Sequence, residues 1–231
     1  MKYGEIVQLG RHRLMCGDAT SREDVMMLVD GEHVDLVLTD PPYGINLLGK
    51  GSNGRIGQQG REYPAVIGDN GIDMCREHYH IARTLCNRLI MWGGQNFTEF
   101  LPSSCGWIFW DKVKNTDKLS FSDGELAYTS FNTRIKKYAY KWNGNNIAGS
   151  PELNRRVHPT QKPVELHARI LEDFTKPDDV ILDCFGGSGT TLIASEITGR
   201  KCLMMEISPE YCEIITRRYE ELTEGKLPLG V

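Results

Sequence analysis

The stretch VILDCFGGSGTTLIASEITGRKCLMMEIS, residues 180–208, constrains the fold more than any other part of the chain. It contains a short apolar run, a turn with three glycines, a helical pattern, and a second apolar run that leads to an acid. A strand, a helix and a strand in this order form a parallel βαβ unit. Short apolar runs also alternate with helical patterns elsewhere in the chain, which is typical of an α/β domain with a largely parallel sheet.

The 231-residue chain is long enough for one good core, and no linker divides it, so we expect a single domain over residues 1–231. Apolar residues at helical spacing predict helices over residues 166–174 and 212–222. Residues 44–63 and 143–157 are rich in polar residues and glycine or asparagine and are expected to be long loops. The predicted strands are Arg13–Cys16, Val34–Thr39, Leu89–Trp92, Trp107–Trp110, Glu125–Phe131, Val180–Cys184 and Cys202–Glu206.

The composition indicates a soluble protein, with 40% hydrophobic and 25% charged residues. No apolar stretch approaches the roughly 20 residues of a membrane span, and the N-terminus lacks an apolar signal core. We therefore expect a cytoplasmic protein without a membrane partner. The seven cysteines form no C-x-x-C pair, which indicates reduced thiols. Cys75, His78 and His80 lie close together, but no second set of ligands follows at zinc spacing, so an ordinary helix is favoured and no metal is expected.

The glycine turn and the acid after it favour an adenosine-type cofactor. Gly186, Gly187 and Gly189 permit a tight turn and the close approach of a ligand to the backbone. Glu206 is expected at the carboxyl end of the following strand, where its carboxylate can accept hydrogen bonds from both hydroxyls of a ribose. The turn could also be purely structural. NAD is the weaker ligand because Leu192 stands where the dinucleotide pattern G-x-G-x-x-G requires its last glycine.

The motif Asp40-Pro41-Pro42-Tyr43 follows the apolar run VDLVLTD. Asp40 is therefore expected at the carboxyl end of a strand, where open α/β sheets keep their active sites. Because proline has no N–H to donate, the Asp40 carboxylate and the Pro41 carbonyl offer two acceptors with little competition from local donors. Two acceptors suit an amine, and Tyr43 adds a flat ring for stacking.

These motifs resemble those of S-adenosylmethionine-dependent DNA amino-methyltransferases. Asp40-Pro41-Pro42-Tyr43 matches their D-P-P-Y motif, DCFGGSGTT is similar to their cofactor loop, and VHPTQKP is similar to the segment before that loop. The motif order resembles the circularly permuted β group, and FSDGELAYTSF resembles phage and prophage members. The resemblance covers nearly the whole chain. It implies a Rossmann-like methyltransferase fold, with a mostly parallel seven-stranded sheet and helices on both faces.

The resemblance also implies roles for single residues. Asp40, Pro41, Pro42 and Tyr43 would be catalytic, with an acid at position 40 typical of adenine enzymes, and the target base would be flipped out to stack on Tyr43. Within the cofactor site, Asp183 and residues 185–189 would hold the methionine part of S-adenosylmethionine, and Lys162 would face its carboxylate. The full set that would bind this cofactor is Asp18, Ala19, His158, Thr160, Lys162, Asp183, Phe185, Gly186, Gly187, Ser188, Gly189, Thr190, Glu206 and Ile207.

Basic residues are concentrated in two segments although the net charge is −4. Residues 126–164 carry seven basic residues against one acid, interleaved with aromatic residues, and residues 44–61 carry three basic residues and no acid. Such segments are often plain solvated surface, but they also suit phosphate contacts. We expect contacts to double-stranded DNA from Lys50, Arg55, Arg61, Arg134, Lys136, Lys137, Arg155 and Arg156.

The segment left for target recognition is short, about residues 133–156. Larger relatives carry a long recognition region here. Either the recognised DNA site is short, or a second subunit of a homodimer contributes to it.

Other functions are compatible with parts of the sequence. The two acceptors at Asp40 and Pro41 would also serve methylation of a cytosine amine, or of an amine in RNA or protein. A non-catalytic module that binds a nucleoside cofactor and docks on DNA is a further alternative, although such a module would have no use for Asp40 and Tyr43. A dehydrogenase is the least favoured, because the dinucleotide pattern fails.

The basic segments lead to a prediction about salt. If their side chains neutralise DNA phosphates, the affinity for duplex DNA will fall steeply as salt is added, since binding releases counterions. Fluorescence anisotropy with a labelled duplex over a series of salt concentrations measures this dependence. An affinity that does not change with salt would argue against the phosphate contacts.

Overall fold

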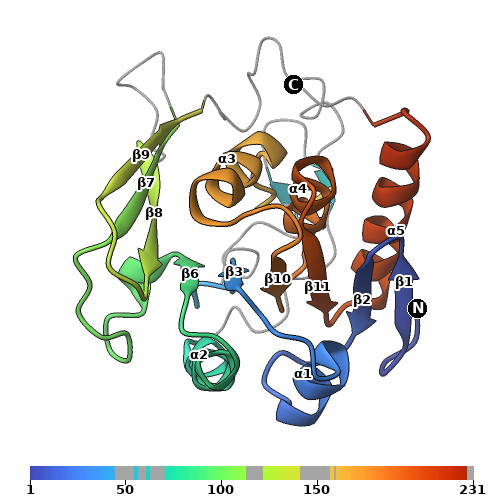
Figure 1. Cartoon of the computed structure of the whole chain (residues 1–231), viewed down its shortest axis with the longest axis horizontal. Coiled ribbons are helices and arrows are strands. Elements are labelled where there is room, and N and C mark those ends of the chain that lie inside the picture. The colour runs from blue at the N-terminus through green and yellow to red at the C-terminus, as the bar shows by residue number, and fades with distance from the viewer. Residues whose placement is uncertain are drawn as a thin grey trace.

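The computed structural model describes residues 1–44, 55–56, 61–62, 71–112, 122–140, 157–158 and 160–227. A nine-stranded sheet runs through the molecule, with helices packed on both of its faces (Figure 1). Its strands are β1 (Ile6–Leu9), β2 (His12–Cys16), β3 (Leu36–Thr39), β6 (Leu89–Trp92), β7 (Trp107–Asp111), β8 (Gly124–Thr129), β9 (Lys136–Ala139), β10 (Val180–Asp183) and β11 (Lys201–Glu206). The helices are α1 (Arg22–Val29), α2 (Asp73–Leu85), the 3-10 helix η1 (Gly94–Asn96), α3 (Val164–Phe174), α4 (Thr190–Thr198) and α5 (Pro209–Thr223).

The strand order is β1-β2-β11-β10-β3-β6-β8-β7-β9. The five strands from β2 to β6 pair in parallel, and β9 pairs in parallel with β7. The pairings of β1 with β2, β6 with β8, and β7 with β8 are antiparallel. Within the part of the chain that the structure describes, the sheet is therefore mixed and has nine strands, so the expectation of seven strands is not confirmed.

The two strands that were missed, β1 and β9, lie at the edges of the sheet (Figure 1). Edge strands are short and carry polar or charged residues, which removes the apolar pattern that reveals a buried strand. In β9 only Tyr138 is buried, and Lys137 and Ala139 are exposed. The seven predicted strands are all present, with ends that differ by up to two residues.

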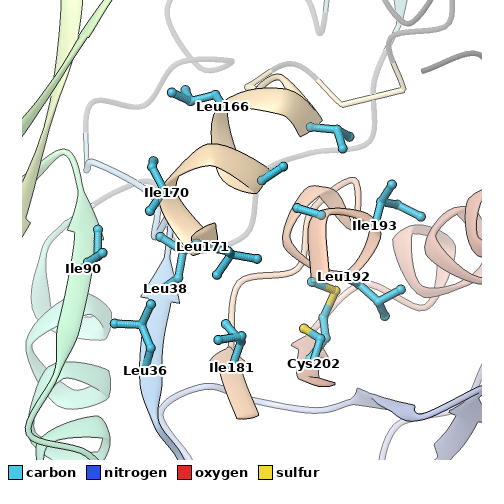
Figure 2. Packing of buried hydrophobic residues seen from close by; sticks show 14 of the residues in the cluster. Leu36, Leu38, Ile90, Leu166, Ile170, Leu171, Ile181, Leu192, Ile193 and Cys202 are labelled. Carbon is cyan, nitrogen blue, oxygen red and sulfur yellow. The ribbon is translucent and has the colours of Figure 1, made fainter. Parts of the chain in front are cut away.

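The core has two halves because neighbouring residues of a strand point to opposite faces. Leu36 and Leu38 of β3 belong to the cluster that packs against α3, α4 and α5, whereas Val37 faces α1 and α2. Figure 2 shows the first half, where Ile170 and Leu171 of α3 lie over β3 and its neighbours. The expectation of helices on both faces is confirmed, as are the two predicted helices, which lie within α3 and α5.

Three strands end side by side with an acid at or directly after each end. β10 pairs in parallel with β3 and with β11, so the carboxyl ends of all three lie at one edge of the sheet. Asp40 follows β3, Asp183 ends β10 and Glu206 ends β11. This edge is therefore the place to look for a site.

The two segments expected to be loops are only partly described. Within residues 44–63 the structure has a short antiparallel pair, β4 (Arg55–Ile56) and β5 (Arg61–Glu62). The chain on either side of this region meets at two glycines, since a Cβ on Gly44 would lie 3.0 Å from the carbonyl carbon of Gly71. The segment 133–156 begins with β9, and residues 141–156 lie outside the described residues. None of the described helices has the length and apolar character needed to cross a membrane.

The packing predicts a contrast between two identical substitutions. Ile181 of β10 is fully buried and Ile135 is 69% exposed. Ile181→Ala removes buried methyl groups and leaves a cavity, which should lower the free energy of unfolding by about 2–5 kcal/mol. Ile135→Ala should change it by less than about 0.5 kcal/mol. Urea unfolding followed by circular dichroism compares the two, and equal losses would contradict the assignment of the core.

Candidate functional site

A pocket opens at the carboxyl edge of the sheet, between β3, β10 and the segment before α3. It encloses about 350 Å³ of empty space, counting the part open to solvent. It brings together one catalytic candidate and most of the residues predicted to bind a cofactor. The lining residues are Asp40, His158, Thr160, Gln161, Lys162, His167, Asp183, Phe185, Gly186, Gly187, Ser188, Thr190 and Thr191.

The Asp40 carboxylate is held by two donors. The hydroxyl of Tyr43 donates to Oδ1 at 2.9 Å, and the ammonium of Lys162 donates to Oδ2 at 2.5 Å. Pro41 is buried, and the carbonyl of Pro42 accepts a hydrogen bond from the Cys75 thiol of α2. The D-P-P-Y turn is therefore fixed both by its own tyrosine and by α2.

Lys162 is the most deeply buried cation of the site, with 4% of its side chain exposed. Its ammonium lies 2.5 Å from Asp40 Oδ2, 3.3 Å from Glu125 Oε2 and 5.0 Å from the centre of the Trp92 ring. It was predicted to face the carboxylate of a cofactor. In the structure it lines the pocket, but its charge is directed to two acids of the protein, and the role toward a cofactor stays a prediction.

The two acids beside Lys162 differ in acidity. Burial raises the pKa of Asp40, and the nearby Glu125 adds to this, so that the attraction of Lys162 does not bring the pKa back to its usual range. Burial would also raise the pKa of Glu125, but the ammonium groups of Lys162 and Lys112 outweigh it and lower that pKa to about 2. Glu125 therefore stays ionised, whereas Asp40 gives up its charge more readily.

The ring of Tyr43 lies against Gly93, directly after β6. A Cβ on Gly93 would meet the Tyr43 ring at 2.3 Å, and Gly93 has φ +70, a conformation that other residues rarely adopt. Phe97 contacts the same ring edge-on, with 6.2 Å between the ring centres. Sequence reasoning missed Gly93, and only its place in the pair Gly93-Gly94 after an apolar run marked it.

Asp183 is buried and fully engaged by the protein. Its carboxylate accepts hydrogen bonds from the Thr39 hydroxyl, the Thr191 hydroxyl and the N–H of Phe185. Burial raises its pKa to about 7, although these hydrogen bonds lower it. Asp183 thus stabilises the start of the glycine loop, residues 184–189 between β10 and α4. Its contact with the methionine part of a cofactor stays a prediction.

A line of hydrogen bonds connects Asp183 to β6. The Trp92 indole donates to His167 Nε2 at 3.2 Å, so Nδ1 carries the proton and donates to the Thr191 hydroxyl at 3.1 Å. Burial, together with the charge of Lys162, lowers the pKa of His167 to about 3, which keeps this imidazole neutral. The Trp92 and His167 rings are parallel, with 6.1 Å between their centres.

The glycine loop is shaped by α5 and by the end of β11. Gly187 N donates to Glu206 Oε2 at 2.7 Å, and Ser208 N donates to Oε1 at 2.9 Å. Arg218 of α5, which is buried, donates to the carbonyl of Ser188. The N–H of Ile207 also acts on this carboxylate, and since a carboxylate can accept about four hydrogen bonds, the three backbone donors leave Glu206 with capacity for one further donor, such as a ribose hydroxyl. This observation fits a nucleoside cofactor.

The remaining cofactor candidates surround this loop. The His158 ring lies 4.6 Å from the ring of Tyr211, and its Nδ1 accepts a hydrogen bond from Thr160 N. Thr190 donates to the carbonyl of Lys162 at 3.2 Å, which ties the start of α4 to the segment before α3. A Cβ on Gly189 would contact Ile215 of α5, so the loop and α5 are closely packed.

Asp18, Ala19 and Ile207 lie at the neighbouring strand ends. Asp18 Oδ1 accepts hydrogen bonds from the backbone and hydroxyl of Thr20, an arrangement typical of a turn. Gly17 N donates to the carbonyl of Glu206, and the Cys16 thiol to that of Ile207, so the three candidates are close in space. Their contact with the cofactor stays a prediction.

His78 of α2 joins this region, although sequence reasoning weighed it only as a zinc ligand. Its Nδ1 lies 3.2 Å from the carbonyl of Ala19, and its ring meets that of Phe185 edge-on at 5.0 Å. Burial lowers its pKa to about 4, so the ring is neutral. Cys75 bonds to Pro42 and His80 packs on Tyr79, which means that the three side chains turn to different neighbours rather than to a common ion.

The residues predicted to contact DNA are only partly described. Lys50, Arg155 and Arg156 lie outside the described residues, and Arg55 and Arg61 belong to the β4–β5 pair. Arg134 is exposed just before β9. Lys136 is paired with Asp173 at 3.1 Å and Lys137 with Asp111 at 2.8 Å, so acids of the protein offset part of their charge. Their role toward DNA stays a prediction.

Comparison with known proteins identifies the family. Residues 94–217, more than half of the chain, match the N6/N4 family of DNA methylases. The chain belongs to the N6/N4 DNA methylase family. This family uses S-adenosylmethionine as its methyl donor.

Two curated relatives of this methylase are type II methyltransferases. M2.MboI of Moraxella bovis is 47% identical over 75 residues, which cover 32% of this chain and 28% of the relative. M.HpaI of Haemophilus parainfluenzae is 23% identical over 254 aligned positions, which cover 92% of this chain and 76% of the relative. The chain thus spans most of M.HpaI but less than a third of M2.MboI.

Solved structures share the fold of this methylase. The M1.HpyAVI–SAM complex matches with a TM-score of 0.60 and 20% identity, covering 88% of this chain and 97% of that chain. The PvuII DNA methyltransferase, described as cytosine-N4-specific, matches with a TM-score of 0.57 and 18% identity, covering 97% of both chains. At this level of identity the likeness shows the fold.

The raised pKa of Asp183 predicts a pH effect on stability. Its usual pKa is 3.8 and its folded value is about 7. The folded protein therefore holds a proton that the unfolded chain has lost, and stability decreases as the pH rises from about 4 to about 7. The loss is about 1.4 kcal/mol per unit of pKa difference.

Asp183→Asn, which cannot titrate, should lack this part of the pH dependence. Urea unfolding of both proteins at pH 5 and pH 7.5, without cofactor, provides the test. The free energy of unfolding of the unsubstituted protein minus that of Asp183→Asn should be smaller at pH 7.5 than at pH 5. A constant difference would show that Asp183 has an ordinary pKa.

Proposed function

We propose that this methylase transfers a methyl group from S-adenosylmethionine to the exocyclic amine of an adenine in DNA. One observation carries the proposal. Asp40, an acceptor suited to an amine, lines the same pocket as the glycine loop between β10 and α4. Methyl transfer requires the methyl donor and the target amine to meet in one place, and this pocket provides it.

The residues around the glycine loop are proposed to bind the cofactor. Glu206 would accept a ribose hydroxyl, Asp18 and Ala19 would lie at the adenine, and the backbone of residues 185–189 would hold the methionine part, with Thr190, His158 and Thr160 beside it. When bound, S-adenosylmethionine supplies a methyl group on a positively charged sulfur, which a nucleophile can attack. The contact between Glu206 and the N–H of Gly187 supports this arrangement, because it sets the loop conformation in advance.

Asp40 and the Pro41 carbonyl are proposed to activate the target amine. The lone pair of an exocyclic amine is conjugated with the ring and is a poor nucleophile. If each of the two acceptors takes one N–H, the nitrogen is drawn toward tetrahedral geometry and its lone pair becomes available. The raised pKa of Asp40 also suits it to stabilise the positive charge that develops on the nitrogen.

Tyr43 is proposed to stack on the flipped base. Its ring is fixed by Gly93 and Phe97, so it offers a surface whose orientation is already set. The Tyr43 hydroxyl also holds Asp40 at 2.9 Å. One residue would thus position both the base and the acid that receives its amine.

Adenine is the proposed target because position 40 is an acid. Cytosine N4 is the second candidate, and the structural likeness to the cytosine-N4-specific PvuII enzyme favours considering it. The order of the motifs supports membership of the permuted β group, and the stretch FSDGELAYTSF supports a phage-like origin. The proposed partner is double-stranded DNA, with a second copy of the chain as the route to a longer recognition site.

The test is methyl transfer by Asp40→Ala. Removing an acceptor that acts in the transition state should lower the rate by on the order of 100-fold or more, whereas the affinity for S-adenosylmethionine should change little. Transfer of labelled methyl to unmethylated DNA, followed by nucleoside analysis, measures the rate and names the base. Calorimetry measures cofactor binding.

Asp35→Ala is the matched control, because Asp35 precedes the other end of β3 and accepts the N–H of Val180. This variant should lose some stability and keep its activity. Turnover by Asp40→Ala at the rate of the control would contradict the mechanism. Methylcytosine in place of methyladenine would change the target and leave the role of Asp40 unchanged.

A further inference from the structure

Glu125 and Lys112 form a charged pair next to Asp40 that the proposed mechanism does not use. Glu125 lies on β8, and Lys112 follows β7, its antiparallel neighbour. The Lys112 ammonium lies 2.6 Å from Glu125 Oε1, and both side chains are largely buried, with 20% and 24% exposed. Buried charges are costly, so their place beside an active acid calls for a reason.

The reason lies in the position of Lys162. Its ammonium lies between Asp40 Oδ2, at 2.5 Å, and Glu125 Oε2, at 3.3 Å. Tyr43 occupies the other oxygen of Asp40. Both oxygens of the acid are therefore engaged before a substrate arrives, and a target amine has to take the place of a donor or share an oxygen with it.

Displacing Lys162 from Asp40 would normally leave a buried ammonium without a partner, which is strongly unfavourable. Glu125 prevents this, because its Oε2 is already within reach of the same ammonium. The Lys112 ammonium on Oε1 keeps Glu125 in place while this happens.

We propose that Glu125 is a positioning residue for methyl transfer, which receives the Lys162 ammonium when the target amine binds to Asp40. The inference rests on the proposed function. In the free protein the Lys162 ammonium pairs with Asp40. When the target amine binds, the ammonium pairs with Glu125 instead, and the Asp40 carboxylate becomes available to the amine.

The surroundings of Lys162 support this assignment. The titratable groups that face it are Asp40, Glu125, Tyr43 and His167, with Asp183 close to Asp40 and Lys112 beyond Glu125. His167 is neutral and Tyr43 keeps its proton, because burial lowers the pKa of the first and raises that of the second. Glu125 is therefore the ionised group that can pair with the Lys162 ammonium in place of Asp40.

The decisive variant is Glu125→Gln, which keeps the shape and removes the charge. Lys162 should then pair with Asp40 alone. The pKa of Asp40 should fall, because the negative charge of Glu125 raises it and the full attraction of Lys162 lowers it. Carbon-13 NMR of the carboxyl groups in the cofactor-free protein measures this shift without any need for activity.

The kinetic expectation has two parts. The plateau of kcat/KM against pH should fall by about 10-fold or more, since Asp40 becomes a weaker and less accessible acceptor. The acid limb of the profile should move to lower pH, since Asp40 stays ionised further into the acid range. A side chain with only a structural role would lower the plateau and leave the acid limb in place. Glu125→Asp, which restores the charge, should move the limb back.

Glu32→Gln is the matched control. Glu32 also pairs with a lysine, Lys201, at 2.6 Å, and its side chain is exposed to the same extent as that of Glu125, 24%. This variant should move neither the pKa of Asp40 nor the pH profile. A double-mutant cycle with Lys162→Met adds a further criterion: the loss of kcat/KM caused by Glu125→Gln should be much smaller once Lys162 is absent, although the direct effect of the Glu125 charge on the pKa of Asp40 remains.

Two results would overturn the inference. One is an Asp40 pKa that is the same in Glu125→Gln and in the unsubstituted protein. The other is an acid limb that does not move. If Glu125→Gln behaves like the control while Asp40→Ala is inactive, the inference fails and the proposed function stands. If the unsubstituted protein transfers no methyl group to DNA, the proposed function fails, and the NMR titration still decides whether Glu125 controls the charge of Asp40.

Discussion

The parallel pairing of β10 with β3 on one side and with β11 on the other determines where the candidate functional residues lie. Parallel strands that start at one edge of a sheet all end at the other, so Asp40, Asp183 and Glu206 meet although they come from distant parts of the sequence. The glycine loop follows β10 and the D-P-P-Y turn follows β3, so the two lie side by side at the same edge of the sheet. The antiparallel strand β8 then brings Glu125 to this edge. The location of the site thus follows from the order of the strands.

The site places several ionisable side chains in the protein interior, where a charged group is energetically costly. Burial raises the pKa of both Asp40 and Asp183, and Lys162 is a cation with almost no access to water. A core of the same size built from apolar side chains would be at least as stable. The arrangement is therefore better understood as serving chemistry than as serving stability. The stability of the fold comes from the layers of apolar residues on either side of the sheet, and Trp92 of one layer also lies against the Lys162 ammonium.

Much of the fold could be predicted from the sequence because each of the central strands contains a buried apolar run. The same reasoning failed for β1 and β9, which are strands of four residues at the edges of the sheet and bury a single residue each, too few to give a clear pattern. In the site, the motifs predicted Asp40 and the glycine loop, since each combines residue types that have few other uses. They could not reveal Glu125 or Gly93. The importance of Glu125 depends on Lys162, which reaches it from a different element, and that of Gly93 on the ring of Tyr43.

The contact between Gly44 and Gly71 has a consequence for how this protein can vary. Because Gly44 and Gly71 are in contact, the segment between them begins and ends at the same point of the fold. The entropic cost of closing a loop rises only slowly with its length, so segments of different length could be exchanged between these two glycines with little loss of stability. The D-P-P-Y turn, which precedes Gly44, would lie outside such an exchange. The position next to Tyr43 is thus suited to change in evolution without loss of the fold.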